Sequence, residues 1–369
     1  MTEKEAYVAF NLAGGYGSAK VAELAAREGS VAAAWESVRD AVARGGGNVD
    51  FAAEMRLAAK YGVAVVTPAD GEYPAALLAA RSHPLALYVK GSPAALSKPC
   101  VAIVGTRRAT SYGLSVARNL ACDLAADGWA VVSGLALGID AEAHRGALDA
   151  NGATVGVLGS ALDRFYPEEN RALAHEIVAK GGAVVSEFPF GRGPDAQTFP
   201  QRNHVVAGLC RGVVAVEAPR KSGTLITASL AADLGRTVMA IPGRIDSNAS
   251  AGCNALIRDG ARLVRDARDV QRELSELSMV CAPAAPRAAK VPAPPAPQTP
   301  APPENIPYTL EESVVMRNVD DAPVSMDVLL RKTGLPPAKL NVACISLRMK
   351  GRLDFLPGNR VAAASSRLR

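Results

Sequence analysis

The sequence lacks the patterns that mark several classes of protein. No run of 18 or more apolar residues is present, so a membrane-spanning helix is not expected. The N-terminus, MTEKEAYVAF, lacks the basic-then-apolar layout of a secretory signal. The six cysteines lie at least 22 residues apart without a C-x-x-C pair, which favours reduced, buried thiols, and the four histidines show no metal-ligand spacing. We therefore expect a cytoplasmic protein with no structural metal and no cofactor.

Two catalytic motifs are also missing. The stretch RKSGT at 220–224 is not part of a G-x-x-x-x-G-K-[ST] loop, so ATP hydrolysis is not expected. No G-x-S-x-G elbow surrounds Ser222, which makes it a poor candidate for a nucleophile. The net charge of +5 is uneven, because the residues from Arg331 to Arg369 include nine Lys/Arg and one acidic residue. A polyanion bound by the rest of the chain therefore needs a local pocket rather than a general positive field.

Composition divides the 369 residues into four segments, which we predict to be a helical domain at 1–65, a central domain at 66–280, a linker at 281–306 and a small domain at 307–369. The first segment is Ala-rich, and its GGYG stretch between two helical patterns resembles a helix-hairpin-helix unit. Such a turn presents backbone N–H groups to phosphate, or it serves only packing, and the sequence leaves both readings open. The nine prolines of the third segment indicate a semi-rigid linker.

The last segment has the pattern of a winged helix. Three helical stretches are expected near 309–318, 325–333 and 336–350, with Gly334 at a helix–turn–helix corner. They precede a hairpin whose tip we place at Pro357-Gly358-Asn359. Winged helices bind duplex DNA or protein, and the basic charge of this one favours DNA only weakly.

The central segment alternates short apolar strands with helical stretches. The expected strands are 100–104, 129–132, 154–158, 183–186, 213–217 and 237–241. This alternation predicts an α/β fold with a doubly wound sheet that is mostly parallel. In such sheets ligands bind beyond the carboxyl ends of the strands, and this is where the unusual polar residues of the sequence lie.

The loops after these strands predict a crevice for phosphate. Several begin with a small residue and enter a helix, which would place free N–H groups around one site, and Arg107 adds a charged donor. Phe199, close to Arg202 and Asn203, suits a splayed-out base. Three structural alternatives stay open: Arg107 forms a salt bridge within the fold, Phe199 lies in the core, and Asp140 is the N-cap of the helix that follows it. Asp163 and Tyr166-Pro167 are interpreted as turn-formers.

These loops resemble those of the DprA/Smf family, the DNA-processing proteins of bacterial transformation. The resemblance covers residues 1–280 and rests on GTRRATSYG, SGLALGIDAEAH, YPEEN, SEFPFG, FPQRN, SGTLITA, PGRID and GCNALIRDGA. It implies that the central domain is an extended Rossmann-like fold. It also implies a non-catalytic protein that binds and protects single-stranded DNA, forms a homodimer through the central domain, displaces single-strand-binding protein and loads RecA recombinase.

The resemblance and the loop positions together predict the site residues. The predicted DNA contacts are Arg107, Arg108, Ser111, Ser133, Gly134, Ala136, Gly138, Gln197, Phe199, Arg202, Asn203, Lys221, Ser222, Gly223 and Thr224. The chain departs from the family pattern at His204 and Gln201, which stand where basic residues are frequent, and a lysine found near Ala196 in some members is absent. These changes remove fixed charge, so we expect weaker affinity, or affinity that depends on pH through His204.

Two other functions remain as alternatives. Nucleotide phosphoribohydrolases share the fold group, but Thr227 occupies the place of their catalytic glutamate. The second alternative is a regulator that binds duplex DNA through the winged helix and uses the central fold as a nucleotide sensor.

Overall fold

We analysed a computed structural model of the chain. The structure describes residues 1–46, 49–80, 82–280, 308–319, 324–350, 352–356 and 360–363. These residues belong to two compact units, Met1–Ala285 and Pro286–Arg369, which are treated separately below.

The first unit begins with four helices: α1 (Glu3–Ala13), α2 (Ser18–Glu28), α3 (Val31–Arg44) and α4 (Phe51–Tyr61). The first three pack around Phe10 and Trp35, whose ring centroids lie 5.1 Å apart in an edge-on contact. Gly14 and Gly15 take φ angles of 66° and 72° between α1 and α2, conformations that glycine adopts readily. The two predicted helices joined by a glycine turn are therefore present, while the contact of this turn with phosphate stays a prediction.

The described part of the first unit contains a nine-stranded sheet in the order β1-β2-β6-β5-β4-β3-β7-β8-β9. The strands are β1 (Val63–Val66), β2 (Leu87–Gly91), β3 (Cys100–Val104), β4 (Ala130–Ser133), β5 (Thr154–Val157), β6 (Ala183–Ser186), β7 (Gly212–Ala215), β8 (Thr237–Ala240) and β9 (Arg262–Leu263). The pairs β1–β2 and β2–β6 are antiparallel and all others are parallel. The predicted doubly wound, mostly parallel sheet is confirmed.

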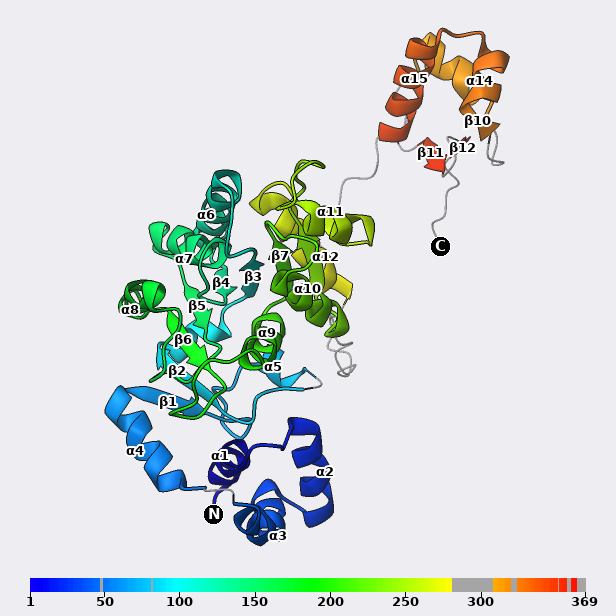
Figure 1. The fold of residues 1–369 in the computed structure, drawn as a ribbon. Helices are drawn as coiled ribbons and strands as arrows, with labels where there is room; N and C mark the ends of the chain where they lie inside the picture. Colours follow the sequence, from blue (N-terminus) through cyan, green and yellow to red (C-terminus); the bar gives the residue numbers. More distant parts are fainter. Residues whose placement is uncertain are drawn as a thin grey trace, which may run out of the picture. The chain divides into compact units, whose positions relative to one another are not determined.

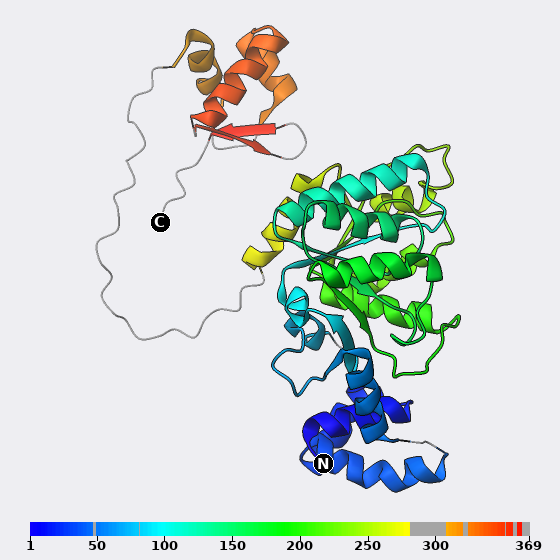
Figure 2. The ribbon, with the colours of Figure 1, turned by 90° about the vertical axis from the view of Figure 1, so that its left-hand side faces the viewer.

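The six expected strands lie within two residues of their predicted positions, but β1, β2 and β9 were missed. β1 falls at the end of the segment predicted to be helical. A four-residue apolar run such as VAVV does not distinguish a strand from a buried helical turn by its periodicity. Figures 1 and 2 show α1–α4 grouped at the β1 edge of the sheet, where α4 packs against β1.

Helices cover both faces of the sheet (Figure 1). One face carries α6 (Ser111–Ala126), α7 (Ile139–Asp149), α8 (Arg171–Ala179) and α12 (Ala267–Val280). The other carries α5 (Ala75–Leu78), α9 (Thr198–Leu209), α10 (Gly223–Asp233), α11 (Ala251–Arg258) and the 3₁₀ helix η1 (Pro93–Ser97); a second 3₁₀ helix, η2 (Glu168–Asn170), precedes α8. Because both faces are buried, the central strands are almost wholly apolar.

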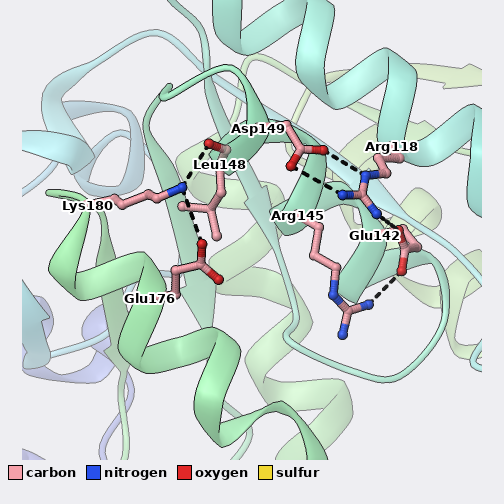
Figure 3. A network of polar contacts seen from close by, with 7 residues as sticks. All are labelled: Arg118, Glu142, Arg145, Leu148, Asp149, Glu176 and Lys180. Atoms are coloured by element: carbon pink, nitrogen blue, oxygen red, sulfur yellow. Dashed lines mark hydrogen bonds and ion pairs between the residues drawn. The ribbon is translucent and has the colours of Figure 1, made fainter.

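An exposed ion-pair network links the helices of the first face, as Figure 3 shows. Arg118 Nε on α6 lies 2.7 Å from Asp149 Oδ2, at the end of α7, and Arg118 also reaches Glu142. Lys180, beside α8, contacts the Leu148 carbonyl. Exposed pairs of this kind contribute little energy singly, so we assign the network a role in fixing helix positions.

The first unit is held by apolar packing rather than by cross-links. The described cysteines are all unpaired, and Cys100, Cys210 and Cys253 are buried. Within the described residues, no helix is both long and apolar enough to span a membrane.

The second unit is a winged helix, as predicted. It consists of α13 (Leu310–Met316), α14 (Met326–Thr333), α15 (Pro337–Met349) and the strands β10 (Val324–Ser325), β11 (Leu353–Leu356) and β12 (Arg360–Ala363), in the sheet order β10-β12-β11. Gly334 ends α14 with a φ of 64°, which confirms its place at the helix–helix corner. The expected hairpin tip at Pro357-Gly358-Asn359 lies outside the described residues.

Candidate nucleic-acid interface

The main candidate site of the first unit lies where the strand order reverses. β3 is flanked by β4 on one side and β7 on the other, so the loops at their carboxyl ends diverge and leave a crevice. This crevice is a pocket of about 370 Å³, here called the main pocket. It is lined by Val104, Gly105, Thr106, Arg107, Arg108, Gly134, Ala136, Asp140, Phe199, Pro200, Arg202, Asn203, Val206, Pro219, Lys221, Ser222, Gly223, Thr224, Ile226 and Thr227.

The rim of the main pocket is cationic. Arg107, Arg108 and Lys221 are exposed. The described residues place no carboxylate within ion-pair distance of any of the three, so the salt-bridge reading of Arg107 is not supported. The Arg107 guanidinium instead lies 5.1 Å from the centroid of the Phe199 ring, a cation–π contact. These charges remain available to an anionic ligand.

One helix N-terminus opens into this pocket. Ser222 is the N-cap of α10, and its Oγ accepts a hydrogen bond from the Thr224 N–H at 3.2 Å. The first residues of α10 line the pocket, where their remaining N–H groups and the helix dipole favour a phosphate.

The N-terminus of α6, one of the helix ends expected to offer free N–H groups to the crevice, is occupied. The Glu217 carboxylate accepts hydrogen bonds from the Thr110 N–H (2.9 Å) and the Thr110 hydroxyl (2.6 Å). A Cβ at Gly113 would lie 2.4 Å from the Glu217 carboxylate, so this glycine permits the approach. Ser111, predicted to contact DNA, is exposed but does not line the pocket.

Arg202 forms the floor of the pocket and is almost fully buried, with 6% of its surface exposed. Its guanidinium donates hydrogen bonds to the carbonyls of Gly134 and Val157. Burial lowers the pKa of Arg202 to about 10, against the opposing effect of Asp140. The donors of Arg202 therefore hold the loop after β4, and its predicted contact with DNA stays a prediction.

Asp140 completes that arrangement. Its carboxylate accepts a hydrogen bond from the Gly134 N–H at 3.1 Å, so it folds back on the loop and is not the N-cap of α7, a place taken by Gly138. Burial raises the pKa of Asp140, while the neighbouring Arg202 charge opposes the rise. A Cβ at Gly134 would lie 2.6 Å from Arg202 and 2.7 Å from Asp140, which explains a glycine at this position.

Three further predicted contacts do not line the main pocket. Ser133 is fully buried, and its hydroxyl donates to the Ile103 carbonyl at 2.6 Å, which ties β4 to β3. Gly138 has a φ of 79°, and a Cβ there would meet the Thr106 carbonyl. Gln197 is the exposed N-cap residue of α9. The remaining eleven predicted residues all line the pocket, and whether each contacts DNA stays a prediction.

The Phe199 ring is neither buried in the core nor fully open to a stacked base. It lies in the first turn of α9 and is half-buried. A Cβ at Gly159 would lie 2.8 Å from the ring, and the Tyr166 centroid is 5.8 Å away at a tilt of 54°. Together with Arg107, these contacts leave only part of the ring open to a ligand.

Sequence reasoning missed several lining residues. Thr106 follows Gly105 at the end of β3, and Ile226, on the first turn of α10, is 46% exposed. An exposed isoleucine one turn after the Lys221–Thr224 stretch was the available clue. Asp163 lies in a turn, as expected, and its carboxylate also accepts a hydrogen bond from the N–H of the distant Gly191.

The two departures from the family pattern lie outside the main pocket. His204 Nδ1 contacts the Gln201 carbonyl and lies 4.0 Å from Glu187 Oε1. Burial raises the pKa of Glu187 to about 8 and lowers the pKa of His204. Both groups are therefore neutral near pH 7 and form no ion pair. The expectation that His204 makes DNA affinity depend on pH loses its structural basis, because the imidazole does not line the pocket.

The lining also bears on catalysis. Thr227 donates to the Gly223 carbonyl at 3.3 Å, and Asp140 is the pocket's carboxylate among the described residues. That carboxylate is committed to Gly134, so the geometry offers no support for the phosphoribohydrolase alternative. No cluster of three His, Cys, Asp or Glu side chains in the described ranges is placed to hold a metal ion.

Comparisons with known proteins agree with this architecture. The family model of DNA recombination-mediator protein A matches residues 64–275, and that of the DprA winged helix domain matches residues 292–359. The chain is similar to protein Smf of Escherichia coli, with 36% identity over 302 residues, 80% of this chain and 76% of that protein.

Two solved structures are similar as well. DNA processing protein A of Streptococcus pneumoniae has 33% identity and a TM-score of 0.61, over 74% of this chain and 98% of that one. DNA processing protein A of Helicobacter pylori, whose structure concerns its single-stranded DNA binding mode, has 31% identity and a TM-score of 0.51, over 58% of this chain and 96% of that one.

Proposed function

Because the chain belongs to the DNA recombination-mediator protein A family, also called DprA or Smf, we propose that it binds single-stranded DNA in the main pocket. The solved relative from Helicobacter pylori binds single-stranded DNA, and this chain shares the fold that forms the site. The finer proposal is that it protects incoming single strands and loads RecA recombinase onto them during transformation.

One observation carries the proposal. The exposed cations Arg107, Arg108 and Lys221 surround a pocket that also holds the Phe199 ring and the N-terminus of α10. Cations and helix N–H groups suit phosphates, while an aromatic face suits an unstacked base. A duplex hides its base faces, so this combination favours a single strand.

The test is a comparison of single-stranded and duplex DNA of equal length by fluorescence anisotropy. Oligo-dT should bind more tightly than the duplex, and the logarithm of the affinity should fall with the logarithm of salt concentration by about 0.7 per phosphate neutralised. The base sequence should matter little, because the pocket offers phosphate and stacking contacts. A strong preference for duplex, or affinity that does not change with salt, contradicts the proposal.

The winged helix is the competing site. α15 exposes Val342 and Ile345, which are 68% and 56% accessible, on the helix that would enter a DNA groove. An apolar exposed stripe favours protein over phosphate, so we expect residues 1–281 alone to retain most oligo-dT binding. Loss of binding in that truncation would assign the DNA site to the basic C-terminal segment.

The partners complete the proposal. We expect a homodimer through the central domain, direct association with RecA and exchange with single-strand-binding protein. Light scattering of the purified protein checks the dimer. RecA filament assembly on DNA coated with single-strand-binding protein checks the loading step, which should be slow without this protein and fast with it.

A further inference from the structure

A small hollow of about 30 Å³ adjoins the main pocket beside Phe199. We call it the side hollow; it is lined by Leu137, Gly159, Tyr166 and Pro167 together with Arg107 and Phe199 of the main pocket. The loop after β4 contributes Leu137 and the loop after β5 contributes Tyr166, so the hollow continues the pocket along the carboxyl edge of the sheet.

Two large apolar side chains of the side hollow are exposed to solvent. Tyr166 is 45% exposed and Leu137 is 39% exposed. Phe199, in contrast, is half-buried and carries the Arg107 guanidinium 5.1 Å from its ring centroid. A base that enters the site therefore finds its larger open aromatic surface on Tyr166.

We propose that Tyr166 and Leu137 form a second nucleotide subsite, where the base next to the one in the main pocket stacks on the tyrosine ring. This inference rests on the proposed binding of single-stranded DNA. Arg107 lines both the main pocket and the side hollow and is placed to contact the phosphate between the two bases.

The two rings contact each other. The centroids of Phe199 and Tyr166 are 5.8 Å apart, so the faces they turn towards one another are closed to a base and only their other faces can take one. The tilt of 54° between the rings would turn the second base out of the plane of the first.

Local charge places the phosphates on the arginine side. Glu168, two residues after Tyr166, is paired with Arg171 at 2.5 Å, which offsets its charge. Arg164 is 62% exposed on the same loop, with Asp163 at 3.9 Å. The proposal places the base on Tyr166 and the backbone near Arg107, which lines both the main pocket and the side hollow.

The experiment uses the full chain with dT6 and with an abasic hexamer that keeps the same phosphates. Tyr166→Ala should weaken dT6 binding about tenfold, the usual loss for one stacked base, and should leave the abasic hexamer unchanged. Tyr166→Phe should retain dT6 affinity, and Tyr166→Leu should lose it while filling the same space. Tyr112→Ala is the matched control, since Tyr112 is 53% exposed and lines neither hollow.

Each outcome decides the matter. Equal losses for dT6 and the abasic strand mean that Tyr166 supports the fold or the charge, which overturns the subsite. Normal dT6 binding by Tyr166→Leu also overturns it. If the wild type fails to bind dT6 at all, the proposed function itself fails, a result distinct from either of these.

Discussion

Among the residues of the main pocket, Arg202 is the one for which a structural role and a role in ligand binding predict the most different effects of substitution. Replacement by alanine removes a buried guanidinium whose donors satisfy the carbonyls of Gly134 and Val157 and whose charge faces Asp140. Its removal leaves these two buried carbonyls without a donor, at about 1–3 kcal/mol each, and leaves the buried Asp140 without a neighbouring cation. We therefore expect Arg202→Ala to lose about 2–6 kcal/mol in the free energy of unfolding.

The pH dependence of this loss gives it a second signature. Asp140 already has a raised pKa through burial, and removal of the opposing Arg202 charge raises it further. A carboxylate whose pKa is higher in the folded state binds protons more tightly there, so folding gains stability as the pH falls. The destabilisation by Arg202→Ala should therefore shrink as the pH falls towards about 4, the ordinary pKa of aspartate.

Urea unfolding followed by circular dichroism measures both effects. The double variant Arg202→Met/Asp140→Asn should recover much of the lost stability, since both charges are gone. Arg107→Ala is the control, because it removes an exposed arginine of the same pocket. If Arg202→Ala unfolds within about 1 kcal/mol of the wild type and only dT binding falls, the guanidinium is a ligand contact and the reasoning fails.

The other predictions concern Arg107 and Phe199 of the main pocket and the buried Glu187. Arg107→Ala should weaken oligo-dT binding by about 1.5–3 kcal/mol with an unchanged melting temperature; a sharply lower one would show a structural role. Phe199→Ala should weaken oligo-dT about tenfold and Phe199→Trp should keep much of the affinity, while a stability loss of about 3–5 kcal/mol for the alanine variant would make the ring a core residue. Glu187 has a pKa near 8, so its burial costs stability progressively as the pH rises from its unfolded value towards 8. Glu187→Gln should therefore gain free energy of unfolding relative to the wild type between pH 5 and pH 8; a constant difference over this range would refute the raised pKa.

The strands predicted most accurately from the sequence are those that are buried on both faces along their whole length. β3 and β6, buried on both faces, are unbroken apolar runs bounded by small or turn residues, and their limits were predicted to the residue. β2 and β9 gave no such pattern. β2 ends in Lys90 and Gly91, and β9 is a two-residue edge strand whose side chains are exposed.

The location of the site could be predicted from the sequence, but which of its residues are structural and which are open to a ligand could not. The position of polar loops at strand ends follows from the parallel sheet, which is why eleven of the fifteen predicted residues line the pocket. Sequence could not show that Arg202 is buried, because α9 presents it to Asp140 from an element distant in the chain. Nor could it show that Glu217 closes the end of α6, since the two meet through a fold-dependent contact of Thr110 with a residue 107 positions away.

The occupied N-terminus of α6 explains why the GTRRATSYG loop carries two arginines. A dinucleotide-binding loop brings neutral backbone close to a pyrophosphate, and the helix after β3 would supply the N–H groups. Here Glu217 occupies that helix end, so α6 has little capacity left for an anion. The positive charge at the end of β3 must instead come from side chains, and Arg107 and Arg108 provide it at the rim. Flexible cations can follow a backbone whose phosphates change place, whereas a fixed ring of N–H groups selects one small anion. Removal of Glu217 by substitution to Gln should therefore not create a tight phosphate site at α6, because Thr110 still caps the Gly113 N–H and the amide still fills the space.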